Sequence, residues 1–183
     1  LLYEWIDGCT LDAVSGPWRA GEVATVGRAV CEALSYLHTL RDGAIIHRDV
    51  SPSNVFVTRA GGVKLGDLGV AYCVDSTGPV PQAITRGFGA PGQLDQGPVD
   101  ARADIYALGK TLLTLTDDSK LIDVLERATH DSPDARFESA GALSSALGEA
   151  YETVSPQEIA ALLEAPAPRP VLDHAVRSIL GGS

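Results

Sequence analysis

Residues 47–69 are HRDVSPSNVFVTRAGGVKLGDLG, and this stretch contains two short apolar strands joined by a glycine-rich turn. The side chains at 55–57 and 63–65 favour β-structure, and the two adjacent glycines between them suit a hairpin turn. Asn54 precedes the first strand, and Asp67 follows the second strand by two residues. Folding the strands together therefore brings both side chains to the same open end of the hairpin.

The side chains at that open end have the chemistry of a magnesium site. A carboxylate and an amide oxygen are hard ligands, and phosphate oxygens can complete an octahedron around Mg²⁺. Asp49 lies in the loop that leads into this end, where its carboxylate can accept a proton from a hydroxyl nucleophile. A carboxylate base beside a metal site that binds phosphate is typical of phosphoryl transfer. The sequence therefore predicts Asn54 and Asp67 as metal ligands and Asp49 as a general base.

The hydrophobic periodicity of the remaining chain is mainly helical. One long amphipathic helix is predicted over residues 21–40. Later apolar residues mark three more helices: Ile105 to Leu115, Leu121 to Ala128, and Leu143 to Ala150. A capping box with proline at the first helical position, at 155–158, predicts a short fifth helix. The fold class is therefore α+β, mainly helical around a small β-hairpin, with a long functional loop over residues 73–103.

Composition and charge exclude several classes of partner. The chain has 183 residues, enough for one hydrophobic core, and a net charge of −10. Such a surface repels nucleic acid and anionic membranes, so neither is an expected partner. No apolar run approaches the roughly 18 residues of a membrane span, and no signal peptide is visible. Three scattered cysteines lack metal-binding spacing and indicate free thiols in a reducing, cytoplasmic compartment.

Five segments resemble those of eukaryotic-type protein kinases of the serine/threonine class. His47-Arg48-Asp49 with Asn54, followed by Asp67-Leu68-Gly69, is similar to the catalytic loop and magnesium motif, with leucine replacing the usual phenylalanine. The other similar segments are LLYEWIDG (1–8) for the hinge, Ala90-Pro91 for the end of the activation segment, DARADIYALG (100–109) for the central helix, and SPDARFESAGAL (132–143) around Arg136. The resemblance runs from Leu1 to about Tyr151.

The resemblance implies ATP and Mg²⁺ as cofactors and a protein as substrate, with transfer of the γ-phosphate to a Ser or Thr hydroxyl. It implies that Asp49 is the catalytic base and that Asn54 and Asp67 hold the metal. Thr85 resembles the threonine that hydrogen-bonds the catalytic aspartate in serine/threonine kinases. Asp104 would fix the backbone of the catalytic loop.

For the nucleotide, the resemblance places backbone groups near Glu4 and Ile6 at the adenine, and Phe56 under the adenine ring. It implies a kinase domain over residues 1–151, reduced to the hinge and the C-terminal lobe, and then a helix, a Pro-rich linker and a tail over 152–183. The chain has no methionine, and the motifs of the N-terminal lobe are absent. We therefore expect a longer parent chain that supplies this lobe, and no kinase activity from the 183 residues alone.

Three departures from the family pattern bear on function. Ser51 stands where serine/threonine kinases commonly carry a lysine that neutralises the transferred phosphate. Gly92 stands where a glutamate pairs with the arginine that matches Arg136, so Arg136 is expected to be exposed or paired with a loop aspartate such as Asp131. Only five residues separate Leu115 from Leu121, where most members have an extra helix that docks protein substrates.

These departures leave two alternatives to an active protein kinase. A pseudokinase or regulatory scaffold is favoured by the residues at positions 51 and 92 and by the missing docking helix. A small-molecule phosphotransferase with a related Asp…Asn…Asp arrangement is favoured by the missing helix alone. A glycine-rich loop and a strand lysine upstream in the parent chain would favour catalysis over the scaffold.

Overall fold

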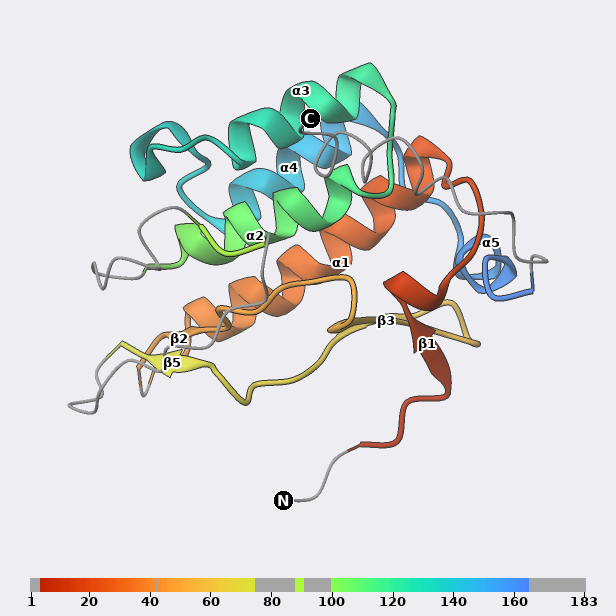
Figure 1. Cartoon of the computed structure of the whole chain (residues 1–183), viewed down its shortest axis with the longest axis horizontal. Coiled ribbons are helices and arrows are strands. Elements are labelled where there is room, and N and C mark those ends of the chain that lie inside the picture. Colours follow the sequence, from red (N-terminus) through yellow and green to blue (C-terminus); the bar gives the residue numbers. More distant parts are fainter. Residues whose placement is uncertain (1–3, 42, 75–87, 91–99, 165–183) are drawn as a thin grey trace, which may run out of the picture.

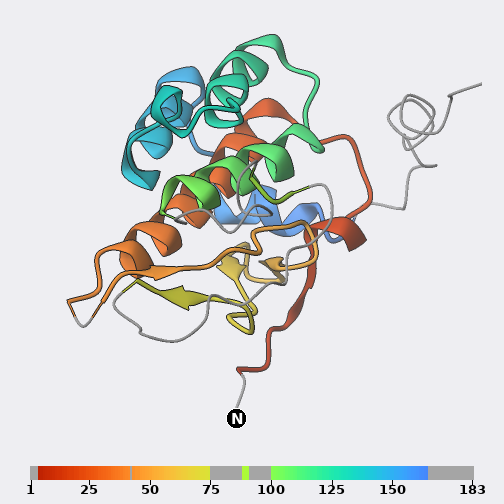
Figure 2. The same cartoon turned by 60° about the vertical axis from the view of Figure 1, so that its left-hand side comes forward.

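The computed structural model describes residues 4–41, 43–74, 88–90 and 100–164. Its elements are, in chain order, β1 (Gly8–Thr10), η1 (Leu11–Ala13), α1 (Ala20–His38), β2 (Ile45–Ile46), β3 (Val55–Thr58), β4 (Val63–Leu65), β5 (Tyr72–Cys73), α2 (Arg102–Leu113), α3 (Ser119–Ala128), η2 (Pro133–Ala135), α4 (Ala140–Ala150) and α5 (Pro156–Ala161). Helices α2, α3 and α4 gather on one side of α1, and the strands lie on its other side (Figures 1 and 2).

Helix α1 is the centre of the core, because it packs against α2 and α4 and also against β4. Its buried face repeats at helical spacing, with Val23, Val26, Val30 and Leu34 almost completely shielded from solvent. The opposing side chains come mainly from the other helices: Ile105, Leu108, Leu112, Leu121, Leu125, Leu143 and Leu147. Each such burial stabilises the fold by about 1.5–3 kcal/mol, so this main core fixes the helices relative to the hairpin.

The predicted helices are confirmed, and their observed ends differ from the predicted ones by only a few residues. The N-terminal caps explain where two of them begin: the Asp118 side chain accepts the amide of Lys120, and the Ser139 hydroxyl accepts the amide of Ala142. Residues 114–118, which join α2 to α3, contain no helix. None of the helices in the described residues is both long and apolar enough to cross a membrane.

The strands form two small antiparallel sheets, β1–β3–β4 and β2–β5. The predicted hairpin is confirmed, with Val55 opposite Leu65 and Val57 opposite Val63. The sequence LLYEWIDG (1–8) predicts an apolar strand at its start and a turn at Asp7-Gly8. Leu1 to Tyr3 lie outside the described residues, and the predicted turn at Gly8 is wrong. Residues 4–7 are not a strand, and β1 begins at Gly8, because its backbone pairs with β3 from Thr58 onward.

Candidate active site

The open end of the β3–β4 hairpin brings together two of the predicted site residues. The amide of Gly66 donates to the carbonyl oxygen of Asn54 at 2.8 Å, which extends the ladder by one step beyond the strands. Asp67 follows directly and is exposed, whereas Asn54 is buried. Both residues therefore lie at the same end of the hairpin, as the sequence predicts.

Asp49 lies against Asn54. The Asn54 Nδ2 group donates to the main-chain oxygen and to Oδ2 of Asp49, both at 2.8 Å. These two bonds use the nitrogen of the amide, so its Oδ1 remains suited to a cation. The main-chain amide of Asn54 donates a further bond to the Ser51 carbonyl at 3.0 Å, which closes the loop between Asp49 and Asn54. Asp49, the candidate base, and Asn54, the candidate metal ligand, are therefore held together as one unit.

His47 joins this loop to the strand that leads to Asp67. Its buried imidazole donates from Nε2 to the Gly66 carbonyl at 3.0 Å and accepts the Asp49 amide at Nδ1 at 3.3 Å. A neutral imidazole protonated at Nε2 satisfies both bonds. His47 therefore fixes Asp49 relative to the residue that precedes Asp67.

Asp104 anchors the same loop from helix α2. Its buried carboxylate accepts the His47 amide at 2.8 Å and the Arg48 amide at 2.7 Å. It also contacts Nε2 of His38, at the end of α1, at 2.8 Å. No sequence motif marks His38, but its position one turn after the buried Leu34 places it on the inward face at the end of α1.

Two residues of this site have left-handed backbone conformations. Arg48 has φ 70° and Asp67 has φ 63°, and among the described residues they are the non-glycine residues with positive φ. Such conformations cost of order 1–3 kcal/mol each and persist where the surroundings fix them. The bond from the Arg48 amide to Asp104 Oδ1 at 2.7 Å, and the bond from the Gly69 amide to Asp67 Oδ1 at 2.9 Å, provide this support.

The Arg48 guanidinium lies inside the protein beside this loop. Burial lowers its pKa from the ordinary value, and the nearby Asp104 carboxylate opposes that shift. Its Nη1 donates to the Val70 carbonyl at 3.3 Å, and its Nε is buried with no hydrogen-bond partner among the described residues. The guanidinium therefore links the loop at residues 47–54 to the segment after Gly69.

A cavity of about 430 Å³ opens beside the hairpin. Its lining includes all three residues predicted to meet adenine, and the full set is Glu4, Trp5, Ile6, Phe56, Lys64, Leu65, Gly66 and Asp67. An ion pair between Glu4 and Lys64 crosses from the N-terminal segment to β4. A Cβ atom at Gly66 would lie 2.8 Å from the Phe56 ring, so glycine there leaves room for this ring in the lining of the cavity.

The residues at the open end of the hairpin suit a divalent cation that is coordinated partly by the protein and partly by phosphate oxygens of a bound nucleotide. The described residues contain no cluster of three or more His, Cys, Asp or Glu that could hold a metal without help. Asp67 and Asn54 would supply two oxygens, and a bound triphosphate would have to supply others. Mg²⁺ is commonly bound in this way.

The chain matches known proteins over most of its length. Residues 3–155 match the family model of the protein kinase domain. The chain belongs to the protein kinase family. It is 39% identical over 123 residues to a probable serine/threonine-protein kinase PknB of Corynebacterium glutamicum, which covers 63% of this chain and 19% of that protein. Serine/threonine-protein kinase Pkn1 of Myxococcus xanthus is 40% identical over 118 residues, with coverages of 60% and 17%.

The solved structures agree with this membership. The crystal structure of the Mycobacterium tuberculosis PknI kinase domain has a TM-score of 0.61 and 29% identity, and the match covers 80% of this chain and 63% of that chain. The described elements therefore have a kinase-like fold. The present chain spans less than a fifth of the length of the Corynebacterium and Myxococcus kinases.

The expected exposure of Arg136 is wrong, because 4% of its surface is exposed. Among the described residues no aspartate side chain forms an ion pair with it. Its guanidinium donates to three main-chain carbonyls, of His130 at 2.7 Å, Arg102 at 3.1 Å and Asp131 at 2.9 Å. It also lies 4.7 Å from the centre of the Tyr106 ring. Backbone oxygens have taken the place of the kinase glutamate.

The other departures from the kinase pattern are visible where the chain is described. Ser51 is fully buried, and its hydroxyl lies 3.0 Å from that of Ser53. The link from α2 to α3 contains no docking helix. Thr85, Pro91 and Gly92 lie outside the described residues, as do Leu1 to Tyr3 of the predicted hinge.

Proposed function

We propose that this chain is the hinge and C-terminal lobe of an ATP-dependent protein kinase that phosphorylates Ser or Thr hydroxyls of cytoplasmic proteins. The single observation that supports it best is the unit formed by Asp49, Asn54 and the Gly66-Asp67 segment. His47 and Asp104, both buried, hold this unit together through hydrogen bonds. The N-terminal lobe would come from the parent chain.

Asp49 is the proposed general base. Its carboxylate orients the acceptor hydroxyl and takes its proton as the acceptor oxygen bonds to the γ-phosphorus and the bond to ADP breaks. Asn54 and Asp67 are the proposed ligands of Mg²⁺, which would neutralise charge on the phosphates. Glu4 and Ile6 would contact adenine through backbone groups above Phe56, and Thr85 would favour Ser/Thr acceptors.

A scaffold without catalysis is the second candidate, and the buried Ser51 favours it. A neutral hydroxyl enclosed at that position offers no cation to the transferred phosphate. A small-molecule acceptor stays open as a third candidate, since the α2–α3 link has no helix for docking a protein. Both candidates keep the nucleotide site, but the scaffold transfers no phosphate, whereas the third candidate transfers it to a small molecule.

The test is phosphate transfer from γ-labelled ATP by the full-length protein, with Mg²⁺ and then with excess chelator. We expect metal-dependent label on Ser or Thr of protein, and loss of that label in the isosteric variant Asp67→Asn. Nucleotide binding without transfer would support the scaffold, and label on small molecules alone would support the third candidate. The isolated 183-residue chain is expected to transfer none.

A further inference from the structure

The segment after α4 returns to the catalytic hairpin. The match to the kinase family model ends at residue 155, yet the chain continues into α5 and its side chains enter the main core. Ile159 is fully buried there, and Leu162 and Leu163 pack against the same core. Residues 154–163, which we name the strap, are therefore part of the folded unit that carries the site.

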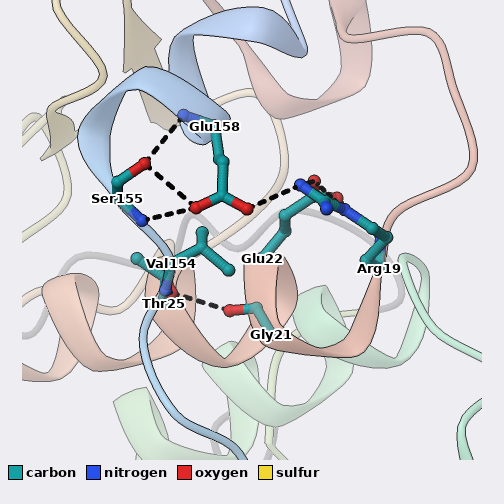
Figure 3. Close-up of polar contacts among 7 residues, drawn as sticks. All are labelled: Arg19, Gly21, Glu22, Thr25, Val154, Ser155 and Glu158. Atoms are coloured by element: carbon teal, nitrogen blue, oxygen red, sulfur yellow. Dashed lines mark hydrogen bonds and ion pairs between the residues drawn. The ribbon is translucent and has the colours of Figure 1, made fainter.

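Two polar contacts fix the strap to the start of α1. The Val154 amide donates to the Thr25 hydroxyl at 2.9 Å. Glu158 closes a capping box by accepting the Ser155 amide at 3.0 Å, and its other oxygen pairs with Arg19 at 3.3 Å. Figure 3 shows Arg19 between Glu158 and Glu22, so one guanidinium joins α5 to α1.

The strap also contacts the turn of the β3–β4 hairpin. Gly61 has φ +80°, and a Cβ atom there would lie 1.8 Å from the carbonyl oxygen of Pro156. The two backbones therefore touch with no room for a side chain. Gly61 is buried, whereas Arg59, Ala60 and Gly62 of the same turn are exposed. Figure 1 shows α5 between the beginning of α1 and this turn.

We propose that the strap is a positioning element for the proposed magnesium ligands. The β3–β4 hairpin is only a few residues long and depends on its neighbours: β1 pairs with β3, α1 packs against β4, and the strap contacts the turn. Asn54 and Asp67 lie at the open end of the hairpin, and Gly61 in its turn contacts Pro156 of the strap. The strap and the core therefore support the hairpin at opposite ends. This inference rests on the proposed function for its catalytic consequence, although the mechanical support can be measured without it.

The test compares Ile159→Ala with Leu125→Ala in the full-length protein. Both side chains are fully buried, but Leu125 belongs to α3, which packs on α2 and α4. Hydrogen exchange of residues 54–67 is measured at temperatures where both variants are equally folded. We expect faster exchange of these amides in Ile159→Ala and wild-type exchange in Leu125→Ala. Equal exchange in the two variants would overturn the proposal.

The catalytic consequence has its own readout. In Ile159→Ala we expect the Mg²⁺ concentration for half-maximal phosphate transfer to rise by about tenfold, with Leu125→Ala unchanged. The milder variant Glu158→Gln, which weakens the pair with Arg19, should move the same quantity in the same direction. An unchanged Mg²⁺ requirement in both strap variants would contradict the positioning role. Absence of transfer in the wild type would refute the proposed function alone, since hydrogen exchange still reports on the strap.

Discussion

Asp104 and Arg136 are two buried charges on neighbouring parts of the fold, and both are neutralised mainly by backbone groups. Asp104 accepts two amides of the catalytic loop and contacts His38. Arg136 donates to three carbonyls and stacks on Tyr106. The kinase pattern predicts the backbone partners of Asp104 correctly, whereas the exposure expected for Arg136 is wrong. The difference shows that a family motif can predict which charged residue is buried. The conformation of the nearby loops determines which groups form hydrogen bonds with it.

Removal of the Asp104 carboxylate is expected to have the largest effect. Asp104→Ala would leave two buried amides unpaired and free the left-handed Arg48 backbone, so we expect a loss of about 3–5 kcal/mol in unfolding free energy. Chemical denaturation measures this loss, and the transfer rate should fall with it. His38→Asn is the milder companion, because it removes only one of three partners. A cost for Asp104→Ala no larger than that for His38→Asn would break the comparison.

Arg136→Ala is expected to be the second largest change. It removes the guanidinium donor from three carbonyls, and this guanidinium is one whose pKa burial already lowers, so we expect a loss of about 3 kcal/mol. Arg136→Lys should cost less, since an ammonium keeps the charge but cannot reproduce the planar fork. Denaturant unfolding of both variants ranks them. A cost for Arg136→Ala below about 1 kcal/mol, the value for an exposed pair, would restore the original expectation.

The smallest effect is expected from restoring the family glutamate. Because the Arg136 guanidinium already donates to three carbonyls, Gly92→Glu should change the unfolding free energy by less than about 0.5 kcal/mol. Thermal unfolding of this variant, alone and combined with Arg136→Ala, sharpens the comparison. A clear gain that disappears in the double variant would mean that a carboxylate can still reach the arginine.

Much of the fold follows from local sequence rules. Helical periodicity, the capping box at Ser155 and the glycines of the hairpin turn each act over a few residues, and the structure agrees with them. The meeting of Asn54 and Asp67 follows from the hairpin alone. Other contacts join segments far apart in the sequence or depend on the path of a loop. They are the contact of His38 with Asp104, the carbonyls around Arg136, and the close approach of Pro156 to Gly61. No pattern in the neighbouring sequence predicts such contacts.

The most direct test of the proposed chemistry is the rate of phosphate transfer in Asp49→Asn, measured in a single turnover with saturating ATP and Mg²⁺ in the full-length protein. The asparagine keeps the shape of the side chain but cannot accept the hydroxyl proton. We predict a fall in rate of about 10²–10⁴-fold, with the nucleotide affinity and the unfolding temperature unchanged. A variant that transfers phosphate at the wild-type rate would contradict the assignment of Asp49 as the catalytic base.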